Sequence, residues 1–307
     1  MLGHHALLHA TISMGNFPQR VYAPEMPARE GRWLPWLVLA LVLVSLAVAS
    51  VVRGSSFHRN HVRGHQRAPS AEPITGVQAN QDVQDTFGHI YESHLWSDGN
   101  GGSGPGSGLN VTQYAMSSIR TVVNRFEIRS LADVPCGGMH WMPYLLRDLR
   151  DDVQDFRYYG LDIVRSVIEA SQIRFANESW MHFEVFDFTR APVPAGVELV
   201  MCRDALQHLP LAMVVDALEM FSKSEARFLL VGSYLGPVAE NRAIVTGDYY
   251  SINLTLDPFL LTGYQHMYHE HTSEFIVEAD KHLLLFPIAY LQSVDYKAMR
   301  ERASLLV

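Results

Sequence analysis

Acidic side chains follow three successive apolar segments in the middle of the chain. Asp133, Asp162 and Asp187 each come at or just after the end of such a segment, and a fourth segment runs into Arg203-Asp204. At the carboxyl ends of neighbouring parallel strands these side chains would face one crevice, where a carboxylate after the second strand can bind ribose hydroxyls. Each residue alone fits a helix cap equally well, so the prediction of a nucleotide-type ligand depends on their joint spacing.

A glycine turn follows the first of these carboxylates. Pro135-Cys136-Gly137-Gly138 comes two residues after Asp133. Glycine lets a ligand approach the main chain closely, and the start of the next helix offers unpaired N–H groups. The turn therefore predicts that backbone groups contribute to binding.

Alternating strand and helix patterns explain how these side chains come together. Strands are expected at 130–134, 157–161, 180–186, 197–202, 227–233 and 282–291, and helices at 114–126, 139–149, 164–173 and 211–221. Strand–helix alternation with short connections predicts an α/β fold with a doubly wound, mostly parallel sheet.

The segment LADVPCGGMHWM at 131–142 resembles motif I of class I S-adenosylmethionine-dependent methyltransferases, in particular a branch with the pattern D-x-P-C-G-D-x-x-W-M. Gly138 departs from this pattern at a position that is usually acidic in the branch. Matching blocks continue in order between about 87 and 291: GSGPGSG at 102–108, YYGLDIV at 158–164, VFDFTRAPVP at 185–194, LVMCRDALQHL at 199–209, TGDYYSINLTLDPF at 246–259 and KHLLLFPIAYL at 281–291. The resemblance implies a seven-stranded, Rossmann-like sheet and S-adenosyl-L-methionine as the cosubstrate.

Carried over position by position, the resemblance implies how the cosubstrate is held. Asp133 and the turn residues Pro135, Cys136 and Gly137 would hold its methionine end. Asp162 would accept hydrogen bonds from the ribose hydroxyls.

The same resemblance implies the remaining walls of the site. Ile163 would lie against the adenine, and Asp187 and Phe188 would border it. Cys202-Arg203-Asp204 would form the floor below the transferred methyl group. The segment at 102–108 would be an ordered part of the site, although its composition alone is typical of a flexible loop.

The candidate catalytic residues are His208 and Asp204. The methyl group of a sulfonium is already activated, so the protein must align an acceptor and exclude water. An oxygen or nitrogen acceptor also has to lose a proton, and His208, one turn beyond Asp204, is the best-placed base. A histidine that caps or packs on the next helix fits the sequence equally well. Asp248 and Asn253 fall in a block that resembles the family's substrate-side wall.

Residues 33–52 form an uncharged apolar segment bracketed by Arg32 and Arg53. Twenty helical residues span the roughly 30 Å core of a bilayer, so we expect a single-pass membrane anchor; a cleaved signal peptide is the alternative. Similar numbers of arginines flank the two ends, so the positive-inside rule leaves the face open. The sequons at Asn110 and Asn177 would be modified only in a lumenal, endomembrane domain.

The expected organisation is a tail at 1–32, the anchor, a flexible stalk at 53–84, a methyltransferase domain at 85–292 and a tail at 293–307.

Composition excludes several classes of protein and of site. A net charge of −8 excludes a general nucleic-acid binder. The two cysteines exclude a disulfide scaffold and a four-thiolate zinc site, and we expect small buried thiols. His266-x-x-His269-Glu270-His271 is a candidate metal cluster, but no matching strand-borne ligand is evident, so we expect no metal ion.

Three functional hypotheses are consistent with a sheet of this kind. A nicotinamide-dependent oxidoreductase requires G-x-G-x-x-G after the first strand, and the turn at 136–141 lacks it. A degenerate methyltransferase fold that only binds a partner predicts lost carboxylates, but these remain. The sequence therefore favours a membrane-anchored methyltransferase whose acceptor, a small molecule, lipid or glycan, is unidentified.

Overall fold

The computed structural model describes residues 79–96, 102–270 and 280–306. The chain divides into two units, Met1–Pro69 and Ser70–Val307, and every described residue belongs to the second. The expected anchor at 33–52 and the tail before it lie outside the described residues. Within the described ranges, no helix has both the length and the apolar character needed to cross a membrane.

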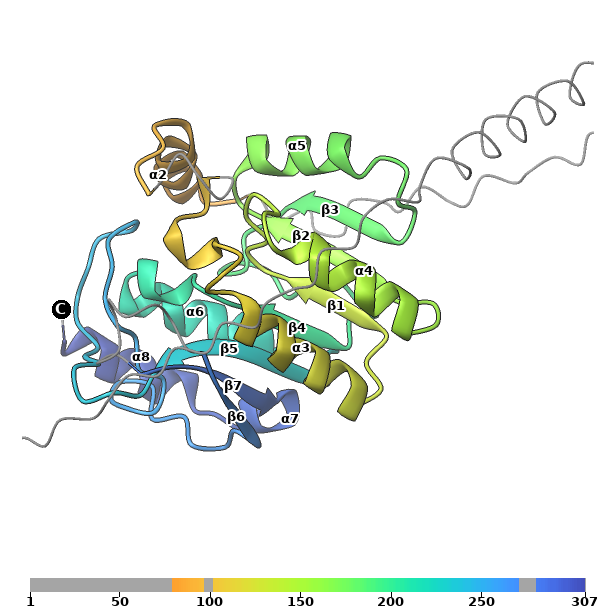
Figure 1. The fold of residues 1–307 in the computed structure, drawn as a ribbon. Coiled ribbons are helices and arrows are strands. Elements are labelled where there is room, and N and C mark those ends of the chain that lie inside the picture. Colours follow the sequence, from red (N-terminus) through yellow and green to blue (C-terminus); the bar gives the residue numbers. More distant parts are fainter. Residues whose placement is uncertain (1–78, 97–101, 271–279, 307) are drawn as a thin grey trace, which may run out of the picture. The chain divides into compact units, whose positions relative to one another are not determined.

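A seven-stranded sheet forms the centre of the Ser70–Val307 unit, with the order β3-β2-β1-β4-β5-β7-β6 (Figure 1). Its strands are β1 (Ser130–Asp133), β2 (Arg157–Asp162), β3 (Met181–Val185), β4 (Leu199–Cys202), β5 (Phe228–Tyr234), β6 (His266–His269) and β7 (Lys281–Pro287). Strands β1 to β5 pair in parallel, whereas β7 is antiparallel to both β5 and β6. The expected doubly wound, mostly parallel sheet is confirmed. Its order reverses between β1 and β4, which is where such sheets bind ligands.

Helices cover both faces of the sheet (Figure 1). They are α2 (Gln81–Glu92), α3 (Gln113–Arg125), α4 (Met142–Asp152), α5 (Arg165–Arg174), α6 (Leu211–Ser222), α7 (Ile288–Leu291) and α8 (Tyr296–Ser304), with short 3₁₀ turns η2 (Pro105–Ser107) and η3 (Leu206–His208). Side chains alternate across a strand, and β4 shows this directly. Leu199 and Met201 pack in the core with α3 and α4, whereas Val200 and Cys202 pack with α6, α7 and α8.

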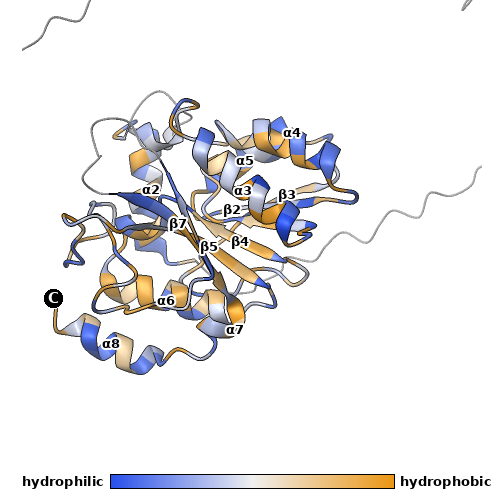
Figure 2. Ribbon diagram, turned by 60° about the horizontal axis from the view of Figure 1, so that its bottom comes forward, coloured by the Kyte–Doolittle hydropathy of each residue, from blue (hydrophilic) through white to orange (hydrophobic). Residues whose placement is uncertain are grey.

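The sheet is built around hydrophobic central strands. Figure 2 shows β4 and β5 largely hydrophobic and α6 mostly so, whereas α8 carries many hydrophilic residues. All four residues of β4 are buried. Strands buried on both faces are continuous apolar runs, which is why 197–202 and 227–233 were predicted within one or two residues.

The folded domain begins before the expected boundary at residue 85. The side chain of Asn80 caps α2 by accepting a hydrogen bond from the Asp82 N–H, and Val83 and Ile90 are buried. The predicted stalk is therefore too long at its C-terminal end. Only a few apolar positions of α2 face the protein, so its polar composition resembled that of a linker.

The expected tail at 293–307 is also wrong, because it contains α8. The Asp295 side chain accepts a hydrogen bond from the Ala298 N–H at 3.0 Å and caps this helix. Met299 and Ala303 are buried, and Arg300 forms ion pairs with two acidic residues of α6. In addition, the strand expected over 282–291 ends at Pro287, and its last four residues form α7.

Candidate active site

A cavity lies at the carboxyl ends of β1 to β4. The predicted site residues that line it are Asp133, Pro135, Cys136, Gly137, Asp162, Ile163, Asp187, Phe188, Arg203, Asp204 and His208. Cys202 does not line it. Its side chain is buried in the core beside α6, because the alternation along β4 turns it away from the cavity. The predicted role of Cys202 in the floor of the site is therefore wrong, and its neighbour Met201 lines the cavity.

Asp133 and Asp162 are buried carboxylates at the ends of β1 and β2. Asp133 Oδ2 accepts a hydrogen bond from the Tyr158 hydroxyl at 2.8 Å. Burial raises the pKa of Asp133 to about 8, against the effect of this hydrogen bond. Asp133 therefore holds a proton at neutral pH unless a positive charge binds beside it.

Asp162 fixes the glycine turn to the end of β2. Its Oδ2 accepts a hydrogen bond from the Gly137 N–H and its Oδ1 from the Val164 N–H, both at 2.9 Å. Burial raises its pKa to about 6, and these backbone hydrogen bonds oppose the rise. Because each oxygen of a carboxylate accepts more than one hydrogen bond, Asp162 retains capacity for ligand hydroxyls at pH 7.

Asp187 connects the sheet to the first described helix. Its Oδ2 accepts a hydrogen bond from the Asn80 N–H, and its Oδ1 accepts two from the N–H and hydroxyl of Thr189. Three hydrogen bonds thus hold this carboxylate at the cavity wall. Phe188 and Thr189 line the cavity beside it.

The glycine-rich segment at 102–108 is ordered and forms part of the cavity wall. Ser103 Oγ lies 3.0 Å from the Tyr91 hydroxyl and accepts a hydrogen bond from the Gly138 N–H at 2.8 Å. A Cβ at Gly137 would lie 2.6 Å from Ser103 Oγ, so only glycine allows this approach. The segment is therefore ordered, and Ser103 and Ser107 line the cavity.

Four charged side chains form a cluster at the floor of the cavity; Arg203, Glu270 and Lys281 are buried, and Asp204 is partly exposed. Arg203 donates two hydrogen bonds to the Glu270 carboxylate, at 2.8 and 3.0 Å, and its Nη1 lies 2.8 Å from Asp204. Lys281 Nζ is 2.5 Å from Asp204 and 2.8 Å from Glu270. The cluster holds two positive and two negative groups, so each buried charge has partners of opposite sign. Although burial opposes ionisation, Arg203 and Lys281 hold the pKa of Asp204 below its usual value.

Asp204 adopts a backbone conformation unusual for a residue other than glycine, with φ of 54°. Its ion pairs hold it there, and Gly106 leaves room for it, since a Cβ at Gly106 would lie 2.8 Å from Asp204 Oδ2. A strained backbone conformation of this kind persists only where surrounding contacts hold it in place, and such conformations are common at functional sites.

His208 lies in η3, with its ring in the cavity wall. Its Nδ1 is 2.8 Å from the Asp248 carbonyl oxygen. A carbonyl only accepts, so Nδ1 carries the proton, and in the neutral ring Nε2 keeps its lone pair. Burial lowers the pKa of His208 below 6.5, against the effect of the Asp248 bond. The Trp96 ring packs against it at a centroid distance of 4.6 Å.

Several residues at the site were not predicted from the sequence. They are Tyr91, Trp96, Tyr158, Glu270 and Lys281. Tyr91 and Trp96 belong to a part of the chain with no motif of its own. Glu270 and Lys281 lie far from Arg203 in sequence. The pairing of β7 with β5 brings Lys281 towards the end of β4, and the pairing of β6 with β7 adds Glu270 beside it.

The structure also places the two cysteines, the candidate metal cluster and Asn253. Cys136 and Cys202 are free, buried thiols, as expected. The predicted cluster at 266–271 does not assemble as one group: His266 packs near the Phe126 ring, Glu270 binds Arg203, and His271 lies outside the described residues. Asn253 is buried, and its side chain accepts hydrogen bonds from Thr255.

No family model matches the sequence, and no curated protein matches it. Magnesium protoporphyrin IX methyltransferase (ChlM) from Synechocystis PCC 6803, solved with bound SAH, is 12% identical over 67% of this chain and 97% of its own, with a TM-score of 0.45. The methyltransferase domain of bacterial CtHen1-C is 12% identical over 58% and 98%, at 0.46. The citrinin polyketide synthase CMeT domain is 15% identical over 56% of this chain but only 50% of its own, at 0.42. At these levels of similarity, the function has to be inferred from the site itself.

Proposed function

We propose that this protein is an S-adenosylmethionine-dependent methyltransferase that acts on an oxygen or nitrogen of a small-molecule, lipid or glycan acceptor, and that residues 33–52 anchor it in a membrane. The composition of the cavity wall supports the enzymatic part of the proposal. The cavity at the switch point of the sheet brings Asp133, Asp162 and Asp187 together with a neutral histidine, His208.

The residues of the cavity fit this cosubstrate. Ile163 and Phe188 offer apolar surface for the adenine. Asp162, fixed by Gly137 and Val164, accepts hydrogen bonds from the ribose hydroxyls. Asp133 faces the positively charged methionine end, where a cation favours its ionised form. When bound, S-adenosylmethionine supplies a methyl group already activated by its sulfonium.

The chain itself supplies a base and excludes water. The Asp248 carbonyl fixes the tautomer of His208, so that Nε2 can accept the proton that the acceptor loses. Trp96 and Leu209 also line the cavity around this histidine and limit the access of water. Asp204 is held by Arg203 and Lys281, so its contribution is to shape the floor.

Calorimetry with S-adenosylmethionine tests the enzymatic proposal. We expect the protein to bind it and Asp162→Ala to weaken binding by about 1–3 kcal/mol, which is roughly 5- to 150-fold in Kd. Asp295→Ala, which removes the cap of α8 outside the cavity, is the matched control and should bind like the parent. Circular dichroism checks folding, because Asp162 also holds two backbone N–H groups. If the folded parent protein releases no binding heat, the chain is instead a degenerate fold that binds a partner.

The acceptor is sought with the active protein. Labelled methyl groups are transferred into fractionated membrane extract, and the labelled species is identified by mass spectrometry. Transfer that disappears in His208→Gln supports the assigned base. Transfer at an unchanged rate in that variant contradicts it.

A further inference from the structure

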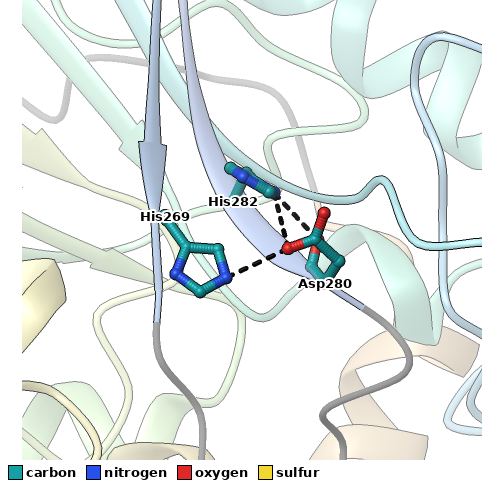
Figure 3. Close-up of side chains that lie close together, drawn as sticks. All are labelled: His269, Asp280 and His282. Atoms are coloured by element: carbon teal, nitrogen blue, oxygen red, sulfur yellow. Dashed lines mark hydrogen bonds and ion pairs between the residues drawn. The ribbon is translucent and has the colours of Figure 1, made fainter.

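Two histidines and an aspartate meet beside the strand pair β6–β7 (Figure 3). His269 ends β6, and it pairs directly with His282 in β7. Asp280 immediately precedes β7. The Asp280 Oδ1 atom lies 3.0 Å from His269 Nε2 and 3.8 Å from His282 Nδ1. The two imidazole rings are 4.9 Å apart between centroids.

This group lies on the face of the ladder opposite to the charged cluster. Along β7, Leu283 and Leu285 pack with α3 and α4, and Leu284 and Phe286 pack with α6 and α7. Successive side chains alternate, so Lys281 points to the first face and His282 to the second. The histidine pair is therefore separate from the cavity and has no part in the methyl-transfer site.

The three side chains provide a donor set typical of a transition-metal site. Two imidazoles and one carboxylate bind zinc and other divalent first-row metals. One ligand atom from each residue lies within 4.8 Å of the other two, so small side-chain rotations bring all three to the roughly 2.0–2.2 Å that zinc requires. The His282 side chain is 9% exposed, whereas those of His269 and Asp280 are 39% and 44% exposed. Solvent can therefore reach the group and supply a fourth ligand.

We propose that His269, Asp280 and His282 form a site for a divalent transition-metal ion such as Zn²⁺. Coordination through His282 Nδ1 replaces its 2.8 Å hydrogen bond to the Asp280 carbonyl. The ion joins the end of β6 to the start of β7, and thereby cross-links the two ends of the connection between them. This assignment differs from the sequence-based expectation of no metal ion, because Asp280 and His282 stand outside the motif at 266–271. It does not depend on the proposed methyltransferase activity.

Equilibrium dialysis of the full-length protein against Zn²⁺, after treatment with EDTA, tests the site. The chain has 15 histidines, so bound zinc is compared between variants. We expect the parent to bind one equivalent more than His269→Ala. His266→Ala removes a histidine of the same strand outside the group and is the matched control, which should bind like the parent.

Thermal unfolding supplies a second measurement. Zn²⁺ should raise the Tm of the parent and of His266→Ala, since a ligand that binds the folded state stabilises it, and should not raise that of His269→Ala. Far-UV circular dichroism confirms that His269→Ala folds, and Asp280→Asn provides the same comparison if it does not. Equal zinc binding and equal Tm shifts in the parent and these variants would overturn the proposal and leave the group as an ion-paired cluster.

Discussion

Replacing Asp133 with asparagine should change how the stability of the protein depends on pH. Asp133 is 3% exposed, and burial raises its pKa from 3.8 to about 8. Between these two values the folded protein holds one more proton at this site than the unfolded chain does. The stabilisation from this proton is complete below about pH 4 and is lost as the pH rises towards 8.

The size of the effect follows from the linkage slope. One proton corresponds to about 1.4 kcal/mol per pH unit, so the free energy of unfolding falls by about 3 kcal/mol between pH 5 and pH 7 because of Asp133. Asparagine stays uncharged over this range, and its oxygen can still accept the Tyr158 hydrogen bond. Relative to the parent, Asp133→Asn should therefore gain about 3 kcal/mol between pH 5 and pH 7.

Urea unfolding of the Ser70–Val307 unit at several pH values measures this difference. Titrations of groups that both proteins share cancel in the comparison. Tyr158→Phe is a useful second variant, because it removes a hydrogen bond that lowers the pKa of Asp133, and its stability should continue to fall above pH 8. A constant difference between parent and Asp133→Asn from pH 5 to pH 7 would refute the assignment of a buried, protonated carboxyl.

Three further predictions concern other parts of the chain. Lys281→Met leaves the buried Glu270 and the partly exposed Asp204 with Arg203 as their one cationic partner in the cluster, so we expect a loss of about 3–5 kcal/mol in the free energy of unfolding, measured with urea. His208→Gln should lower kcat by about 100-fold or more with little change in S-adenosylmethionine affinity, and the kcat of the parent should be constant above pH 7 and fall in acid, because the pKa of this histidine lies below 6.5. If residues 33–52 anchor the protein, alkaline carbonate should leave the full-length chain in the membrane pellet; release into the supernatant contradicts this. A mobility shift with endoglycosidase that requires Asn110 or Asn177 would place the domain in the lumen.

Much of the site could be predicted because strand patterns place residues at one edge of a sheet. Asp133 and Asp162 end buried strands, and the parallel pairing brings them together. The resemblance places Cys202 together with Arg203 and Asp204, but the alternation of side chains along β4 separates it from Met201 and directs it into the core. The period of a strand, which the sequence does contain, therefore predicts this position better than the motif does.

Other features depend on contacts that the sequence does not display. Glu270 reaches Arg203 across 67 positions of the chain, and its neighbours suggested a histidine cluster. Helix α8 is mostly polar, with two buried residues, and α2 has few apolar positions that mark it as part of the domain. Short elements of this kind are stabilised by packing against the rest of the fold more than by local propensity.

The pairing of β6 with β7 makes the site sensitive to deletions of a single residue. Glu270 and Lys281 form ion pairs with Arg203 and Asp204 on one side of this strand pair, and His269 and His282 lie on the opposite side. Because the period of a strand is two, a shift of one residue exchanges its faces. A deletion within 266–269 would therefore move Glu270 to the opposite side and withdraw a carboxylate that neutralises Arg203. An insertion in the connection between β6 and β7 would leave this register unchanged. Changes in length should therefore be tolerated in the connection and selected against within the two strands.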